Sequence, residues 1–201
     1  MKAITIFVEG GGPTARTGQQ ILREGFDAIL ATQKTAARRK NLRWQLGLYG
    51  SRNEAFKAFR NATSRKQQSD IAVLLVDSEE PVADATPEGR VAHLHKRDHW
   101  TLDRADPCCV HLMIQCMEAW IISDTTVLEG YYGNGFRKGV LPKRQRLDEE
   151  PKQSLYDSLK EATKDTQKGC YDKTKHASEL LKRIRPSVVT EHCTSFRQLT
   201  Q

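Results

Sequence analysis

Two short apolar runs, Ala3 to Val8 and Ile71 to Val76, constrain the fold of this chain more than any other feature. Both runs are rich in Ile and Val, and each is too short for a typical helix, so they predict buried β-strands. Neither run alternates strictly between apolar and polar residues. Strands of this kind are typical of a parallel sheet that helices cover on both faces.

Segments with helical periodicity separate the predicted strands along the chain. The pattern predicts two further strands, over 42–49 and 110–114, and helices over 15–32, 53–66 and 117–128. Strands that alternate with helices form right-handed βαβ units, so the sequence predicts an α/β, Rossmann-like fold with a mainly parallel central sheet. The polar stretch from Glu80 to Pro107 is expected to be a long loop in which Trp100 is packed.

The composition of the chain changes after about residue 130. The segment from Tyr131 to Gly135 interrupts the pattern, and two charged amphipathic helices are expected over 151–163 and 172–184. We therefore expect an α/β domain over residues 1–130 and a helical C-terminal extension over residues 131–201 that packs on it.

The chain is basic, because 32 Lys and Arg residues outnumber 25 Asp and Glu residues and give a formal net charge of +7. Such a balance suits a polyanionic partner such as DNA or RNA. The five cysteines, an odd number without a signal peptide, argue against a disulfide framework. No apolar stretch is long enough to span a bilayer, so we expect a cytoplasmic protein with no membrane partner.

Acidic residues follow three of the predicted strands. Glu9 comes directly after the first strand, Asp77 and Glu79 follow the third, and Glu118 lies just beyond the fourth. Because the carboxyl ends of parallel strands share one edge, where ligands bind in such folds, we expect these side chains to gather. Clustered carboxylates repel one another, and a cation removes that cost. The sequence thus predicts a Mg²⁺ or Mn²⁺ site formed by all four residues, with the first three as catalytic residues.

Two simpler or rival interpretations remain for this region. Acids at strand ends are often helix caps or solvated loop residues, and Glu79 taken alone fits a surface acid. The run Gly10-Gly11-Gly12-Pro13-Thr14-Ala15 also fits the G-x-G-x-x-A turn of dinucleotide-binding proteins. Against this rival, Glu9 would lie beside a pyrophosphate, and no acidic residue ends the second strand to hold a ribose.

A zinc site is the other metal centre to consider. The candidate ligands fall in two groups along the chain, namely Cys108, Cys109 and His111, then Cys170, His192 and Cys193. Their spacing matches no regular zinc pattern, and adjacent cysteines at the start of a strand are more often core thiols. The sequence therefore favours magnesium chemistry over zinc.

Several basic and titratable residues are candidates for supporting roles. We expect phosphate contacts from Arg23, Arg52 and Lys173, although each also fits an ordinary solvated surface charge. Accessory roles at the acidic edge are assigned to His111, Asp124 and His176. Asp124 is the less certain metal ligand, because on one ideal helix it would lie about 120° round from Glu118.

The residues at two of the strand ends resemble the TOPRIM domain of topoisomerases, primases and OLD-family nucleases. The signature there is a Glu after the first strand, here Val8-Glu9-Gly10, and an Asp-x-Asp after a later strand, here Asp77-Ser78-Glu79. The chain departs from the signature by having Glu79 in the last position.

The chain resembles more closely a bacterial TOPRIM-like family of unknown function. The shared segments are Glu9-Gly10-Gly11-Gly12, Arg23-x-Gly25-Phe26, Gly50-x-Arg52, Leu74-Leu75-Val76-Asp77-Ser78-Glu79, His111-Leu112-Met113, Gln115-x-Met117-Glu118-Ala119-Trp120 and Lys173-x-x-His176. Members of that family are often encoded beside an ABC- or AAA-type ATPase, in settings that suggest defence against phage.

This resemblance implies a Mg²⁺-dependent nuclease that hydrolyses nucleic-acid phosphodiesters as the effector subunit of an ATPase-linked defence system. Two other classes of function stay open. One is a non-catalytic subunit that binds nucleic acid or the ATPase and keeps only the fold. The other is a nucleotide-binding protein that uses the loop from Gly10 to Gly12. The choice between DNA and RNA and the formation of a homo-oligomer are also left open.

Overall fold

A computed structural model describes residues 2–10, 16–64, 70–102 and 105–201. Its centre is a four-stranded sheet with the order β2-β1-β3-β4, in which every neighbouring pair is parallel. The strands are β1 (Ala3–Glu9), β2 (Arg43–Tyr49), β3 (Ile71–Asp77) and β4 (Val110–Met113). The predicted α/β fold with a parallel central sheet is therefore confirmed.

The pairing register brings the strand ends that matter for function to one edge of the sheet. Glu9 is paired with Tyr49 at the end of β2, and Asp77 is paired with Met113 at the end of β4. Because β1 and β3 are direct neighbours, with Val8 opposite Leu75, Glu9 lies next to the last residues of β3. This edge is called the carboxyl edge below.

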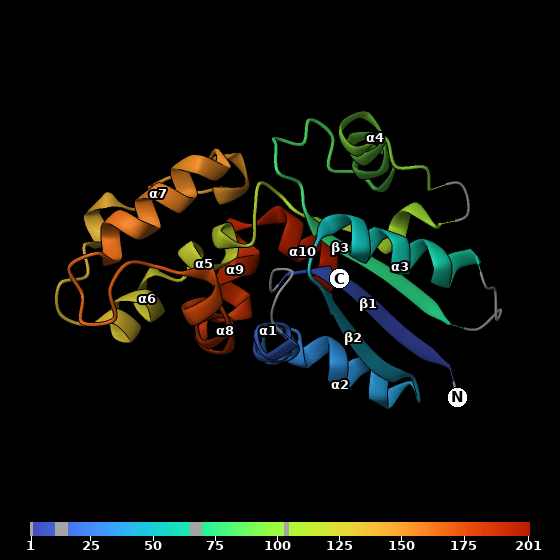
Figure 1. Ribbon diagram of the computed structural model, residues 1–201, viewed down its shortest axis with the longest axis horizontal. Helices are drawn as coiled ribbons and strands as arrows, with labels where there is room; N and C mark the ends of the chain where they lie inside the picture. The colour runs from blue at the N-terminus through green and yellow to red at the C-terminus, as the bar shows by residue number, and fades with distance from the viewer. Residues whose placement is uncertain (1, 11–15, 65–69, 103–104) are drawn as a thin grey trace.

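Helices cover both faces of the sheet, as the apolar strands predicted (Figure 1). One face carries α1 (Arg16–Ile29) and α2 (Ala31–Arg39), and the other carries α3 (Arg52–Ser64) and α4 (Pro87–Asp98). Alternate residues of each strand enter two separate apolar cores. In β3, for example, Leu75 packs on the α1 side and Leu74 on the α3 side.

The remaining helices lie beyond the carboxyl edge or against the sheet, where α8 packs against α1 and α10 packs against β4 (Figure 1). They are α5 (Glu118–Ser123), α6 (Thr125–Tyr132), α7 (Lys152–Thr163), α8 (Lys173–Arg183), α9 (Pro186–His192) and α10 (Thr194–Thr200), with short 3₁₀ turns η1 (Pro107–Cys109), η2 (Lys138–Val140) and η3 (Leu147–Glu149). Side chains from both sides of residue 130, such as Val8, Trp120 and Leu180, share one continuous apolar cluster.

Three predicted elements differ from the structure. The single helix expected over 15–32 ends at Ile29, and a second helix follows a break at Leu30, which lets α1 pack on α8 while α2 follows β2. The helix expected over 117–128 is divided at Asp124, whose side chain accepts a hydrogen bond from Val127 N (3.3 Å) and caps α6.

The predicted loop from Glu80 to Pro107 contains the whole of α4, so the expectation of a structureless segment is wrong. Thr86 caps this helix by accepting a hydrogen bond from Gly89 N (3.1 Å), and Pro87 occupies its first turn. Little of this helix is buried, so it is polar and lacks the apolar residues at helical spacing by which a helix is recognised in a sequence. Trp100 is buried and stacks on Phe56, as expected for a packed aromatic residue.

Candidate metal centre

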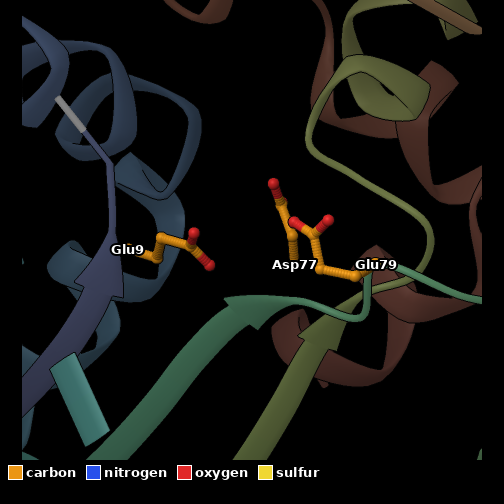
Figure 2. Close-up of side chains that lie close together, drawn as sticks. All are labelled: Glu9, Asp77 and Glu79. Carbon is orange, nitrogen blue, oxygen red and sulfur yellow. The ribbon is translucent and has the colours of Figure 1, made fainter. Parts of the chain in front are cut away.

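Three of the predicted acidic residues meet at the carboxyl edge. Glu9 extends from the end of β1, and Asp77 and Glu79 extend from the end of β3 toward the same space (Figure 2). Each offers a carboxylate oxygen, and these oxygens all lie within 4.8 Å of one another. Among the described residues this is the one such group of three His, Cys, Asp or Glu side chains, so no cysteine cluster of the zinc type is found there.

Backbone hydrogen bonds fix the turn that carries Asp77 and Glu79. Ser78 N donates to Met113 O (2.9 Å) and Glu79 N donates to Gln115 O (3.0 Å), which ties the end of β3 to the end of β4. Glu79 and Gln115 both have a positive φ, of 66° and 63°, a conformation that non-glycine residues seldom adopt. The turn is therefore held in an unusual backbone shape that presents Glu79 beside Asp77.

The environment of the acids disfavours their negative charge. Burial and the neighbouring Asp77 raise the pKa of Glu9 to about 7, even though Arg52 opposes the shift. Burial also raises the pKa of Asp77, which is only 2% exposed. One oxygen of Asp77 accepts a hydrogen bond from Met117 N (3.0 Å). The carboxylates are thus less well compensated than paired surface acids, and added positive charge would stabilise their ionised forms.

Two lysines from the C-terminal region approach these acids. Lys152, the first residue of α7, lies 2.6 Å from both carboxylate oxygens of Glu79. Lys173, the first residue of α8, places Nζ 3.4 Å from Asp77 Oδ2. Burial works against the charge of Lys173, but Asp77 and Glu118 outweigh it and raise the pKa of the lysine. Burial also opposes the charge of Lys152, but its hydrogen bond to Glu79 raises the pKa, so both ammonium groups stay charged at neutral pH.

Glu118 is the fourth predicted ligand, and it lies outside the group of three. Its side chain is almost fully buried and accepts a hydrogen bond from Tyr171 OH (2.9 Å). Lys173 Nζ is 3.9 Å from Glu118 Oε1 and 3.4 Å from Asp77 Oδ2. Glu118 therefore joins the site through the lysine that it shares with Asp77.

Arg52 was expected to bind phosphate, but its guanidinium group is already engaged within the protein. It donates to the backbone oxygen of Asp77, forms an ion pair with Asp98 (2.7 Å), and lies 3.6 Å from Glu9. Its side chain is 13% exposed and lies over the ring of Trp100. The structure thus gives Arg52 the role of holding Glu9 and Asp77 in place, which differs from a free phosphate contact.

The other expected supporting residues are spread more widely. Arg23 is exposed on α1, near Tyr49 at the end of β2. His111, in β4, has a pKa lowered to about 4 by burial and by Arg90, so it is neutral at physiological pH. No contact joins His111 to the three carboxylates within the described part of the chain.

The remaining two accessory candidates have structural partners. Asp124 forms an ion pair with Arg185, with 2.8 Å between Oδ2 and Nε. His176 is buried among tyrosines, where its Nδ1 accepts a hydrogen bond from Asp172 N (3.1 Å) and lies 3.2 Å from Tyr132 OH. Both residues stabilise the junctions of helices, and their expected roles at the acidic edge are not supported by these contacts.

Sequence reasoning missed three residues that contact the site. Lys152 and Tyr171 come from the C-terminal region, and Asp98 ends α4, where it holds Arg52. Lys152 follows Pro151 at a predicted helix start, but nothing local connects it to Glu79, 73 residues earlier. The glycine loop of the rival interpretation is only partly visible, because Gly11 and Gly12 lie outside the described residues.

Comparison with known protein families matches residues 8–201 to a domain of unknown function, DUF4276. No curated protein and no solved structure matches the chain. In the part of the chain that the structure describes, every helix is too short or too polar to cross a membrane.

Proposed function

The chain belongs to the DUF4276 family, and from its carboxylate site we propose that it is a Mg²⁺- or Mn²⁺-dependent nuclease that hydrolyses phosphodiester bonds of nucleic acid. The single observation that carries the proposal is the approach of Glu9, Asp77 and Glu79 to within 4.8 Å at the carboxyl edge.

The residues present fit a divalent cation. Mg²⁺ binds oxygen ligands at about 2.0–2.1 Å, so two of its ligand atoms are at most about 4.2 Å apart. At most one pair of the three carboxylate oxygens can lie on opposite sides of one ion, and the other pairs would be about 3 Å apart, so the side chains that now lie within 4.8 Å of one another would move inward to bind it. Glu9 Oε2 is also buried and has no hydrogen-bond partner among the described residues. Arg52 Nη1 lies 3.6 Å from this oxygen, too far for a hydrogen bond, so a buried hydrogen-bonding position stays unfilled that an ion would satisfy.

A bound cation would supply polarisation of the phosphodiester and a more acidic water molecule. Glu9, Asp77 and Glu79 would hold it, with Glu118 next to Asp77. Lys173 remains charged beside Asp77, and 35% of its side chain is exposed, so it can meet an anionic phosphate that enters the site. Arg52 keeps Glu9 and the end of β3 in position through the contacts described above.

The expected partners follow from two different grounds. The net charge of +7 supports nucleic acid as the substrate. The proposed ATPase partner and the role in defence against phage come from the family resemblance, because the site itself contains no feature that selects an ATPase.

One observation favours a second candidate function, a non-catalytic subunit that binds nucleic acid or the ATPase. Lys152 lies against both oxygens of Glu79 at 2.6 Å, so one of the three acids already has an internal counter-charge. A site neutralised by its own lysines can be stable without an ion, and it would then present Lys173 to a partner's phosphate without cutting it.

Metal binding and cleavage, measured separately, distinguish these candidates. Mn²⁺ binding is measured by calorimetry, and cleavage is measured on DNA and RNA with Mg²⁺ or Mn²⁺. We expect Glu9→Gln and Asp77→Asn each to lower both metal affinity and cleavage at least about a hundredfold, because even residues that only support metal ligands cost 10–100-fold. The matched control is Asp157→Asn, an exposed aspartate of α7 whose side chain accepts a hydrogen bond from Gln153.

Each candidate has its own outcome in these measurements. Cleavage that survives Glu9→Gln and Asp77→Asn would remove the nuclease proposal. Nucleic-acid binding by the wild-type protein without any cleavage would favour the non-catalytic subunit. Tight, metal-independent binding of a nucleotide would favour the glycine-loop interpretation.

A further inference from the structure

A cluster of exposed basic residues lies at the opposite end of β2 from the carboxylates. It consists of Lys2, Arg38, Arg39, Lys40 and Arg43, and it is called the basic corner below. All five are exposed. They are five of the 32 Lys and Arg residues of the chain. Residues 28–53 as a whole contain six Lys and Arg residues and no Asp or Glu.

The fold holds these residues together through the turn that joins α2 to β2. Leu42 N donates to Ala37 O (2.9 Å), and Asn41 adopts a positive φ of 56° as the chain leaves the helix. Arg43 N then donates to Lys2 O (2.9 Å), which places the start of β1 beside the start of β2. The backbone under the basic corner is therefore fixed by hydrogen bonds.

The basic corner differs from the other basic helix end on this face. At the end of α8, Lys182 is paired with Glu24 and Glu179, and Arg183 is paired with Glu179. Basic residues at a helix C-terminus interact favourably with the negative end of the helix dipole, and this is the simple explanation for both groups. That explanation does not require the basic corner to lack acids. Yet in the described ranges no Asp or Glu forms an ion pair with Arg38, Arg39, Lys40 or Arg43.

From this arrangement we propose that the basic corner binds the phosphate backbone of a nucleic acid at a distance from the carboxyl edge. Exposed arginines and lysines that form no ion pair in the described ranges are what a polyanion recognises without regard to sequence. The acid beside the start of β1, Asp70, accepts a hydrogen bond from Ala3 N (2.8 Å). Small exposed side chains on α2, such as Thr35 and Ala36, would let a backbone approach closely.

The distance between the two regions sets a minimum length for the bound strand. Arg43 and Tyr49 are the two ends of β2, and six residue steps of a strand span about 20 Å. Tyr49 is paired with Glu9, so the basic corner lies about 20 Å from the proposed metal centre. At about 3.4 Å per base pair, a duplex needs about six base pairs beyond the cut to reach the corner. This length requirement rests on the proposed function, whereas binding itself does not.

Fluorescence anisotropy with metal chelated tests the surface without cleavage. The probes are a 20-base-pair DNA duplex, an RNA duplex of the same length and a single strand. The test variant is R38Q/R39Q/K40Q/R43Q, and the control variant removes the same charge elsewhere, K57Q/K96Q/K143Q/K175Q. We expect the test variant to lose at least about thirtyfold in affinity at 50 mM salt, and its slope of log affinity against log salt to fall by up to about 3–4. The control variant should lose severalfold less.

Several results would overturn the inference. Equal losses in the two variants would mean that net charge matters and the corner does not. The inference would also be overturned if the test variant bound nucleic acid as tightly as wild type, or if wild type bound none of the probes. Binding of poly-glutamate in preference to every nucleic acid would instead assign the corner to an acidic protein partner.

A second readout separates this inference from the proposed function. Hydrolysis of a small diester, bis(4-nitrophenyl) phosphate, with Mn²⁺ reports the carboxylates alone, because the substrate is too short to reach the corner. We expect the test variant to hydrolyse it at the wild-type rate. Absence of hydrolysis in both proteins, with binding lost only in the test variant, would refute the nuclease and leave the surface standing. A test variant that loses small-diester hydrolysis while wild type retains it would refute the separation of the two regions.

Discussion

The junction of α5 with α6 and the carboxyl edge of the sheet each bury an aspartate, but the two carboxylates have opposite surroundings. Asp124 is 1% exposed and accepts hydrogen bonds from Arg185 N, Nε and Nη2 at 2.8–3.0 Å, and another from Val127 N. Burial alone would raise the pKa of Asp124, but the hydrogen bonds from Arg185 outweigh it and lower the pKa.

Asp77 is equally buried, yet its environment leaves its charge poorly compensated. Its oxygens receive one backbone N–H, from Met117, and a longer contact of 3.4 Å from Lys173, while Glu9 and Glu79 lie close by. Burial raises the pKa of Asp77 in spite of the lysine. A buried acid with all its hydrogen-bond partners stabilises the fold. A cluster of acids with too few partners instead lowers the free energy of unfolding, and a bound cation can restore it.

The largest expected effect concerns Asp124. Asp124→Ala removes several hydrogen bonds to a charged group and a helix cap, so we expect the free energy of unfolding to fall by about 2–3 kcal/mol. Chemical denaturation measures this change in the free energy of unfolding. The matched control is Asp172→Ala, which removes the cap of α8 without an arginine partner and should cost about 1 kcal/mol. Equal losses of stability in the two variants would show that the hydrogen bonds from Arg185 add little to the stability of the fold.

The pH dependence of the same region has a definite sign. The pKa of Asp124 is lowered in the folded protein, so its charge stabilises the fold above the unfolded pKa of about 3.9. That contribution is lost as the pH falls through the folded pKa. We therefore expect the destabilisation by Asp124→Asn to be full at pH 7 and to shrink below about pH 4. A cost that is constant over this range would show that the charge of Asp124 does not contribute.

Glu9 should behave in the opposite way. Its folded pKa of about 7 lies above the unfolded value, so the ionised side chain costs stability once the pH rises from about 4.5 through 7. Without divalent cations, Glu9→Gln should raise the free energy of unfolding by about 1–2 kcal/mol at pH 8 and leave it unchanged near pH 4.

Thermal unfolding with and without MgCl₂ completes the test of Glu9. Added Mg²⁺ should stabilise the wild-type protein, because the ion binds only the folded site, and it should stabilise Glu9→Gln much less. If Glu9→Gln were less stable than wild type at pH 8 without metal, the ionised Glu9 would not destabilise the metal-free protein, contrary to this prediction.

The smallest effect is expected at Lys152, which supplies the carboxyl edge with its internal counter-charge. Because its ammonium group and a divalent cation would share Glu79, Lys152→Met should raise Mn²⁺ affinity by about fivefold, or about 1 kcal/mol. Calorimetry against Lys175→Met, an exposed lysine of α8, provides the comparison. A lower affinity in Lys152→Met would mean that the lysine supports the ion instead of competing with it.

Local patterns along the chain were enough to predict most of the sheet. The apolar runs fixed β1 and β3 to within a residue, since a strand buried on both faces needs apolar side chains at nearly every position. Polar helices were harder. The helix α4 carries only two buried side chains, Arg90 and Leu94, so it lacks the apolar stripe on which such predictions depend.

The sequence by itself determined the parallel α/β fold, and with it the meeting of Glu9 and Asp77, because strands joined by right-handed crossovers end at one edge. Only the tertiary structure decided that Lys152 and Tyr171 would join them and that Arg52 would be held by Asp98. The physical reason is that periodicity records which face of an element is buried. It does not record which distant segment packs against that face.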